Sequence, residues 1–144
     1  MIPPEYFNLD LEAFRKDGIL PRWTEPLQRH HKLLWKALQH GDGSESMQDI
    51  ASALNTQRYQ IWHGEKSCVI TEVWECPTEL VICHCILTAG NMDELQDLRI
   101  IIEDFARKMG CHRIQARGHP GWMRHWATND AGYDIKAVYV AKES

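Results

Sequence analysis

The hydrophobic residues of this chain repeat with a helical period in its first third and with a strand period in its middle. Segment 26–40, PLQRHHKLLWKALQH, spaces its leucines for one face of a helix, with Pro26 tolerated in the first turn. A turn at 41–45 leads into segment 46–58, SMQDIASALNTQR, which predicts a second helix capped by Ser44 or Ser46. Two consecutive helices therefore open the main body of the chain.

The middle of the chain changes to strands. Segments 59–64, 67–76 and 79–90 are rich in β-branched and aromatic residues, and their short connections suit antiparallel hairpins. The third segment, ELVICHCILTAG, is almost continuously apolar, which predicts a central strand covered on both faces.

A long amphipathic helix follows the third strand. We predict that Asn91 caps it, that Glu94 completes a capping box and that Gly110 ends it. Its buried face recurs every three to four residues: Leu95, Leu98, Ile101, Ile102, Phe105 and Met109. A strand at 111–116, a short helix at 120–127 and a last strand at 133–143 complete the order.

This order predicts an α/β fold, equally describable as α+β, in one domain spanning residues 1–144. We expect a mixed, mostly antiparallel central sheet with helices on both faces, the strand after the long helix lying parallel to the strand before it. Residues 1–25, which contain several prolines and aromatic residues, predict an N-terminal strand or arm packed on the domain.

Composition and charge exclude several classes of function. A net charge of -4 disfavours non-specific nucleic-acid binding, and no apolar run approaches the length of a membrane span. The N-terminus lacks the pattern of a secretory signal, and the five cysteines follow no disulfide framework, so we expect a reducing compartment. We therefore expect neither nucleic acid nor a membrane as a partner.

The order of elements, with the ending GCHRIQARGHPGW…AGYDIKAVYVAKE, resembles the GNAT acyltransferase fold from residue 26 to the end. More narrowly, YQIWHGEKSCVITEVWECP with the later ARKMGCHRIQARGHPGW is similar to small GNAT-like proteins encoded by tailed bacteriophages. Members of that group share a glycine–tryptophan turn and a glycine–aromatic pair, here Gly121-Trp122 and Gly132-Tyr133.

The resemblance implies where acetyl-CoA would bind if the chain were active. Backbone amides of three strand residues, Cys85, Ile86 and Leu87, would meet the pantetheine arm, and Gly90 and Asn91 would meet the phosphates. The corresponding segment TAGNMDELQD lacks the spaced glycines of the family and places Asp93, Glu94 and Asp97 in the first turns. Those carboxylates suit the helix dipole but repel a pyrophosphate.

The catalytic groups implied by the family also differ here. The family's tyrosine, a general acid, falls at Thr128. A base could come from the central strands, where burial raises a carboxylate pKa: Glu72 foremost, with Glu75 and His84. The sequence thus predicts no catalytic residue, with Glu72 as base only if the chain is active.

Two other clusters suggest binding chemistry. Cys83, His84 and Cys85 could be imagined as a zinc site, but alternation along a strand places the thiols and the imidazole on opposite faces. We therefore expect buried thiols and no metal. A mixture of basic and aromatic residues near the C-terminus predicts a surface for protein partners: Arg117, His119, Trp122, Arg124 and Trp126.

Two functional hypotheses follow. The first is a catalytically degenerate GNAT-like bacteriophage protein, an accessory or virion-associated structural or binding component without a cofactor. Its partners would be proteins, among them other virion proteins or a second copy of the chain. The alternative is an active acetyl-CoA-dependent N-acyltransferase that modifies a host or phage target. Either would act in the cytoplasm of the bacterial host, and the first also in the virion.

Overall fold

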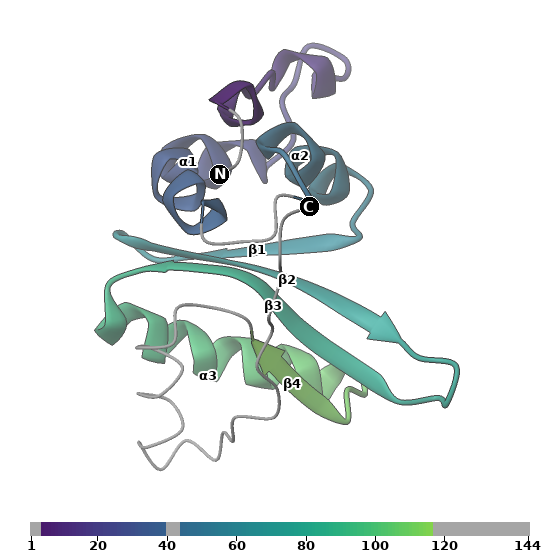
Figure 1. Ribbon diagram of the computed structural model, residues 1–144. Coiled ribbons are helices and arrows are strands. Elements are labelled where there is room, and N and C mark those ends of the chain that lie inside the picture. Colours follow the sequence, from purple (N-terminus) through teal and green to yellow (C-terminus); the bar gives the residue numbers. More distant parts are fainter. Residues whose placement is uncertain (1–3, 40–43, 117–144) are drawn as a thin grey trace, which may run out of the picture.

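The computed structural model describes residues 4–39 and 44–116 (Figure 1). The helix predicted at 120–127, the last predicted strand and the predicted surface from Arg117 to Trp126 lie outside these residues. Within the described residues, no helix is long and apolar enough to cross a membrane.

The N-terminal residues form an arm, as predicted, but without a strand in its described part. Two short 3-10 helices, η1 (Pro4–Phe7) and η2 (Glu12–Phe14), precede one isolated bridge between Lys16 and Ile19. Several apolar residues of the arm pack against the helix side of the core: Tyr6, Leu9, Leu11, Phe14 and Trp23.

Helix α1 (Thr24–Leu38) begins two residues earlier than the sequence predicted. The reason is Thr24, whose backbone N–H and side-chain hydroxyl both donate to the carbonyl of Pro21. Its buried face carries the predicted leucines: Leu27, Leu34 and Leu38. Helix α2 (Met47–Asn55) is capped by Ser46, the second of the two residues predicted, in a reciprocal capping box with Asp49.

The four described strands form one sheet in the order β1-β2-β3-β4. Strands β1 (Tyr59–His63), β2 (Ser67–Glu75) and β3 (Val81–Gly90) pair antiparallel, and β4 (Arg113–Ala116) pairs parallel to β3 after helix α3 (Met92–Lys108). The mixed, mostly antiparallel sheet is therefore confirmed.

The sheet separates two hydrophobic cores (Figure 1). Helices α1 and α2 cover one face over Cys68, Ile70 and Leu87, and α3 covers the other over Val69, Cys83 and Cys85. Strand β3 contributes to both cores, which confirms that it is covered on both sides.

A β-bulge interrupts β3 near its centre. The pairing with β2 passes from Thr71–Cys85 to Ile70–Leu87, so Ile86 is the additional residue. Bulges leave a residue out of the ladder and bend the strand locally. This bulge therefore falls in the middle of the segment predicted to meet pantetheine.

Gly90 permits the closest backbone approach at the end of β3. Its φ is +125°, and a Cβ there would overlap the Lys66 carbonyl oxygen and the Cα of Ser67. Gly110, after α3, also has positive φ, +75°, but a Cβ there would have no heavy atom within 4 Å.

The two glycines predict different costs of substitution. Gly110→Ala should lower the free energy of unfolding by about 1 kcal/mol, because only the left-handed backbone is strained. Gly90→Ala should cost at least about 2 kcal/mol more, because the strand must also move away from Lys66 and Ser67. Urea unfolding of both variants measures the difference, and equal losses would show that the close contact at Gly90 is unimportant.

Candidate functional site

The residues predicted to bind a cofactor lie along the second half of β3 and at the start of α3. Cys85 faces the α3 side, whereas Ile86 and Leu87 both pack on the α1 and α2 side. Strand β4 pairs with β3 as far as Cys85 and Ala116, and Ala116 is the last residue that the structure describes. The bulge at Ile86 and the start of α3 at Met92 therefore lie only a few residues apart.

The start of α3 is capped by the side chain of Asn91, as predicted. Its Oδ1 accepts hydrogen bonds from the backbone N–H groups of Asp93, at 2.9 Å, and Glu94, at 3.2 Å. Free N–H groups at a helix start are what binds an anion. Two of those groups are already used by the protein.

Glu94 binds the neighbouring hairpin turn, so the capping box predicted for α3 is wrong. Its Oε1 accepts from the hydroxyl of buried Ser67, at 2.7 Å, and from the N–H of Lys66, at 2.9 Å. The close approach at Gly90 brings this turn to the helix start, where Lys66 and Ser67 supply the donors that the carboxylate binds. The bond from Ser67, followed by that from Lys66, holds the pKa of Glu94 below its ordinary value.

The helix start therefore does not fit a pyrophosphate. A phosphate would have to displace the Asn91 side chain and lie beside the carboxylates of Asp93 and Glu94. Carboxylates in the first turn already complement the helix dipole. The N–H groups of Asp93 and Glu94 at this helix start are hydrogen-bonded to the Asn91 side chain of the same chain.

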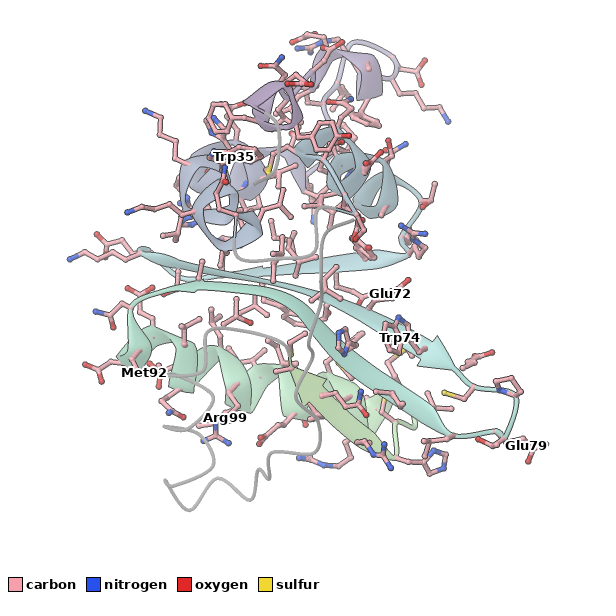
Figure 2. The ribbon with its side chains drawn as sticks, in the orientation of Figure 1. Trp35, Glu72, Trp74, Glu79, Met92 and Arg99 are labelled. Carbon is pink, nitrogen blue, oxygen red and sulfur yellow. The ribbon has the colours of Figure 1, made fainter. Side chains whose placement is uncertain are left out.

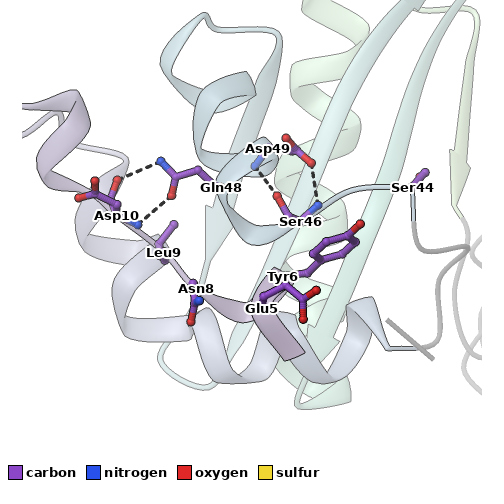
Figure 3. Close-up of a pocket in the computed structure, with 9 residues that line it drawn as sticks. All are labelled: Glu5, Tyr6, Asn8, Leu9, Asp10, Ser44, Ser46, Gln48 and Asp49. Carbon is purple, nitrogen blue, oxygen red and sulfur yellow. Dashed lines mark hydrogen bonds between the residues drawn. The ribbon is translucent and has the colours of Figure 1, made fainter. Parts of the chain in front are cut away.

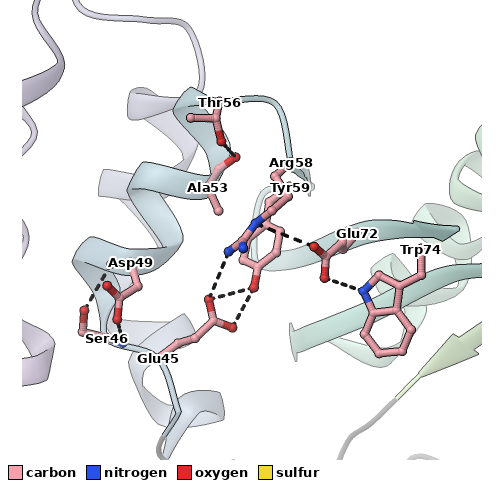
Figure 4. A network of polar contacts seen from close by, with 9 residues as sticks. All are labelled: Glu45, Ser46, Asp49, Ala53, Thr56, Arg58, Tyr59, Glu72 and Trp74. Atoms are coloured by element: carbon pink, nitrogen blue, oxygen red, sulfur yellow. Dashed lines mark hydrogen bonds and ion pairs between the residues drawn. The ribbon is translucent and has the colours of Figure 1, made fainter. Parts of the chain in front are cut away.

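Glu72 lies on β2 and is held by two donors (Figures 2 and 4). One oxygen accepts from the indole N–H of Trp74, and the other is 3.7 Å from Nε of Arg58. Trp74 in turn stacks on the buried ring of His84, with centroids 4.3 Å apart. A carboxylate in these contacts is held in place by one hydrogen bond and one longer ion pair.

The same network extends to three residues that the sequence did not single out (Figure 4). The hydroxyl of Tyr59 donates to both oxygens of Glu45, each at 2.7 Å, and the Arg58 guanidinium lies over the Tyr59 ring. Burial, followed by the Glu45 carboxylate, raises the pKa of Tyr59 above its ordinary range. No spacing motif signals this group, because its members come from the approach to α2, from β1 and from β2.

Glu72 and the helix start are not brought together. Glu72 pairs with His84, whereas Ser67, at the other end of β2, pairs with Gly90. Five residues of strand separate the two positions, roughly 17 Å at 3.4 Å per residue. Glu72 is close in register to the bulge, but its side chain lies on the face opposite to Cys85.

The cysteine and histidine cluster separates as strand alternation predicted. Cys83 and Cys85 face α3, whereas His84 faces Trp74. Among residues 4–39 and 44–116, no group of three potential ligands could hold a metal ion. Burial raises the pKa of Cys68 and Cys83 to about 12 and also raises that of Cys85.

A separate cavity of about 590 Å³ lies between the N-terminal arm and α2 (Figure 3). Gln48 closes one side by binding the backbone of Asp10 twice, accepting from its N–H at 2.8 Å and donating to its carbonyl at 3.0 Å. The described lining includes three acids, Glu5, Asp10 and Asp49, and no lysine or arginine. An anionic cofactor does not fit this cavity.

Comparison with known proteins supports the fold. A crystal structure of an acetyltransferase from Trypanosoma brucei matches with a TM-score of 0.57 and 9% sequence identity, covering 83% of this chain and 94% of that chain. No family model and no curated protein sequence matches the chain. The chain therefore has an acetyltransferase-like, GNAT-like α+β fold.

Replacing Glu94 tests its role at the helix start. Because the native pKa of Glu94 is below 4.5, ionised Glu94 stabilises the protein fully above that pH, and the contribution is lost as the pH falls through the native pKa. Glu94→Gln should be less stable than the parent at pH 7, and the gap should narrow below about pH 4. Asp97→Asn, exposed on the same helix, is the control, and a gap independent of pH would contradict the assignment.

Alkylation tests the buried thiols. At pH 8, iodoacetamide should leave Cys68, Cys83 and Cys85 unmodified in the native protein, because the raised pKa leaves almost no thiolate and burial blocks access. Half-buried Cys76 should react first, and all five cysteines should react in urea. Mass spectrometry of peptides reads the result, and early labelling of Cys85 would show that β3 is not closed on the α3 side.

Proposed function

We propose that this chain is a non-catalytic GNAT-like protein that acts by binding other proteins, as an accessory or virion-associated component of a bacteriophage. The observation that carries the proposal is the start of α3, where the Asn91 side chain already binds two of the helix-start N–H groups and the carboxylates of Asp93 and Glu94 oppose an anion. The fold then serves as a scaffold, and no cofactor is required.

The energetics support this reading. A phosphate at the helix start would lie beside the carboxylates of Asp93 and Glu94, whose charge has the same sign and opposes its binding. Displacing the Asn91 cap adds a further cost of about 1 kcal/mol.

The phage assignment is supported by the resemblance of segments 59–77 and 106–122 to the small phage-encoded group. In that role the protein would work in the host cytoplasm and in the virion, with virion proteins or a second copy of itself as partners. The surface proposed for these contacts is the basic and aromatic stretch from Arg117 to Trp126, where arginine and tryptophan suit an interface.

A second candidate, an active N-acyltransferase, is favoured by one specific feature. The bulge at Ile86 opens the β2–β3 ladder within the segment predicted to meet pantetheine, on an acetyltransferase-like fold. In that case Glu72 would act as base while Trp74 and Arg58 hold its carboxylate in place.

Calorimetry with acetyl-CoA separates the two candidates. We expect no heat of binding at millimolar acetyl-CoA, because the helix start is capped and acidic. The matched variant is Asn91→Asp, which retains a good N-cap and adds one negative charge. Gly90→Glu is unsuitable, because any Cβ at that position overlaps Lys66 and Ser67.

Micromolar binding to the parent, weakened at least tenfold by Asn91→Asp, would overturn the proposal in favour of an acyl-CoA site. Acetyl transfer to a panel of amines would then be measured with Glu72→Gln, whose loss of kcat at unchanged cofactor affinity would identify the base.

A further inference from the structure

The turn between β1 and β2 is held on one side by two histidines and an arginine. His63, the last residue of β1, accepts a hydrogen bond at its Nδ1 from Nη2 of Arg29 on α1, at 2.7 Å. A guanidinium can only donate, so Nδ1 must carry a lone pair. The contact as it stands therefore requires a neutral His63 ring.

His30, one residue further along α1, contacts the same turn. Its ring is buried, its Nε2 lies 3.1 Å from the Gly64 carbonyl oxygen, and its centroid is 6.1 Å from that of His63. A carbonyl oxygen only accepts hydrogen bonds, so Nε2 of His30 carries a proton. The neutral imidazole ring, with its one N–H at Nε2, is sufficient for this hydrogen bond. Burial, followed by the nearby Arg29 charge, lowers the pKa of His30 below its ordinary value.

The other side of the turn is held by α3. Glu94 accepts from Lys66 and Ser67, and its carboxylate lies where a Cβ on Gly64 would stand. The turn is thus bound by α1 on one face of the sheet and by α3 on the other. Residues 64–67 therefore connect the contact of His30 on α1 to the contacts of Glu94 on α3.

Charged groups act on His30 in both directions. Arg29 is the cation next to His30, and a protonated His63 would add a second positive charge beside it. Two acids act in the opposite direction: Glu25, which lies 3.6 Å from Arg29, and Glu94, which binds the turn. Cys68, opposite His63 on β2, is a buried neutral thiol.

We propose that the contact between α1 and the β1–β2 turn is a pH-sensitive latch, closed while His30 and His63 are neutral and released when they are protonated. Protonating His63 replaces the lone pair that Arg29 binds with an opposing N–H, and protonating His30 places a second charge in a buried site. Release breaks the contacts between the turn and α1, and it weakens the hydrogen bonds that Lys66 and Ser67 donate to Glu94 on α3.

Hydrogen exchange on the full chain tests the latch. After correction for intrinsic rates, amides of residues 63–67 should open at least about threefold more at pH 5.5 than at pH 7.5, since the open state takes up protons that the closed state excludes. Amides in the centre of α3 should not change.

Non-titrating mimics supply the variants. His30→Gln keeps a donor toward Gly64, and His63→Asn keeps an acceptor toward Arg29, so the double variant should stay closed at both pH values. His31→Gln, on the neighbouring position of α1, is the matched control and should respond like the parent. A parent without the response, a double variant that keeps it or a control that loses it would each overturn the proposal.

A second measurement remains if the double variant fails to fold. The imidazole nitrogens of His30 and His63 in the parent are titrated by NMR together with the Lys66 amide. Ring protonation and the amide change should share one midpoint. Ring titration without a change at Lys66 would overturn the latch.

Discussion

The contact between Gly90 and the start of β2 determines much of this structure. Because Gly90 has no side chain, the backbone at Lys66 and Ser67 reaches the start of α3, and Glu94 can bind the turn. One close approach thus joins the β1–β2 hairpin to a helix on the far face of the sheet. It also shapes that helix start, since it places Glu94 against Lys66 and Ser67, while Asn91 binds two of the backbone N–H groups that could meet an anion.

In the network around Glu72, farther along β2, single side chains likewise contact more than one partner. Its carboxylate is shared between Trp74 and Arg58, and Arg58 also lies over Tyr59, so the side chains fix one another. In a partly buried setting such a network holds its side chains in place. The Glu72 network and the start of α3 are therefore both held by several contacts within the chain.

The sequence predicted the elements between residues 24 and 116 well, because periodicity, hairpin connections and the Asn91 cap are local signals. It did not predict the bulge, since the run from Val81 to Leu87 is apolar in either register. It also missed the partners of Glu94 and Glu72, which lie far away in the chain. Those contacts depend on how closely two backbones approach, and a single sequence carries no direct record of that distance.

The bulge at Ile86 has a consequence for how β3 tolerates changes in length. Before it, odd-numbered residues such as Cys83 and Cys85 face α3; after it, Leu87 faces the opposite core and Thr88 lies on the α3 side with Val69. The strand therefore runs in two phases of alternation joined at one residue. Deleting that residue would join the two phases into one regular alternation with Leu87 still facing the α1 and α2 side, whereas a change of side chain at the same place leaves the bulge in the strand.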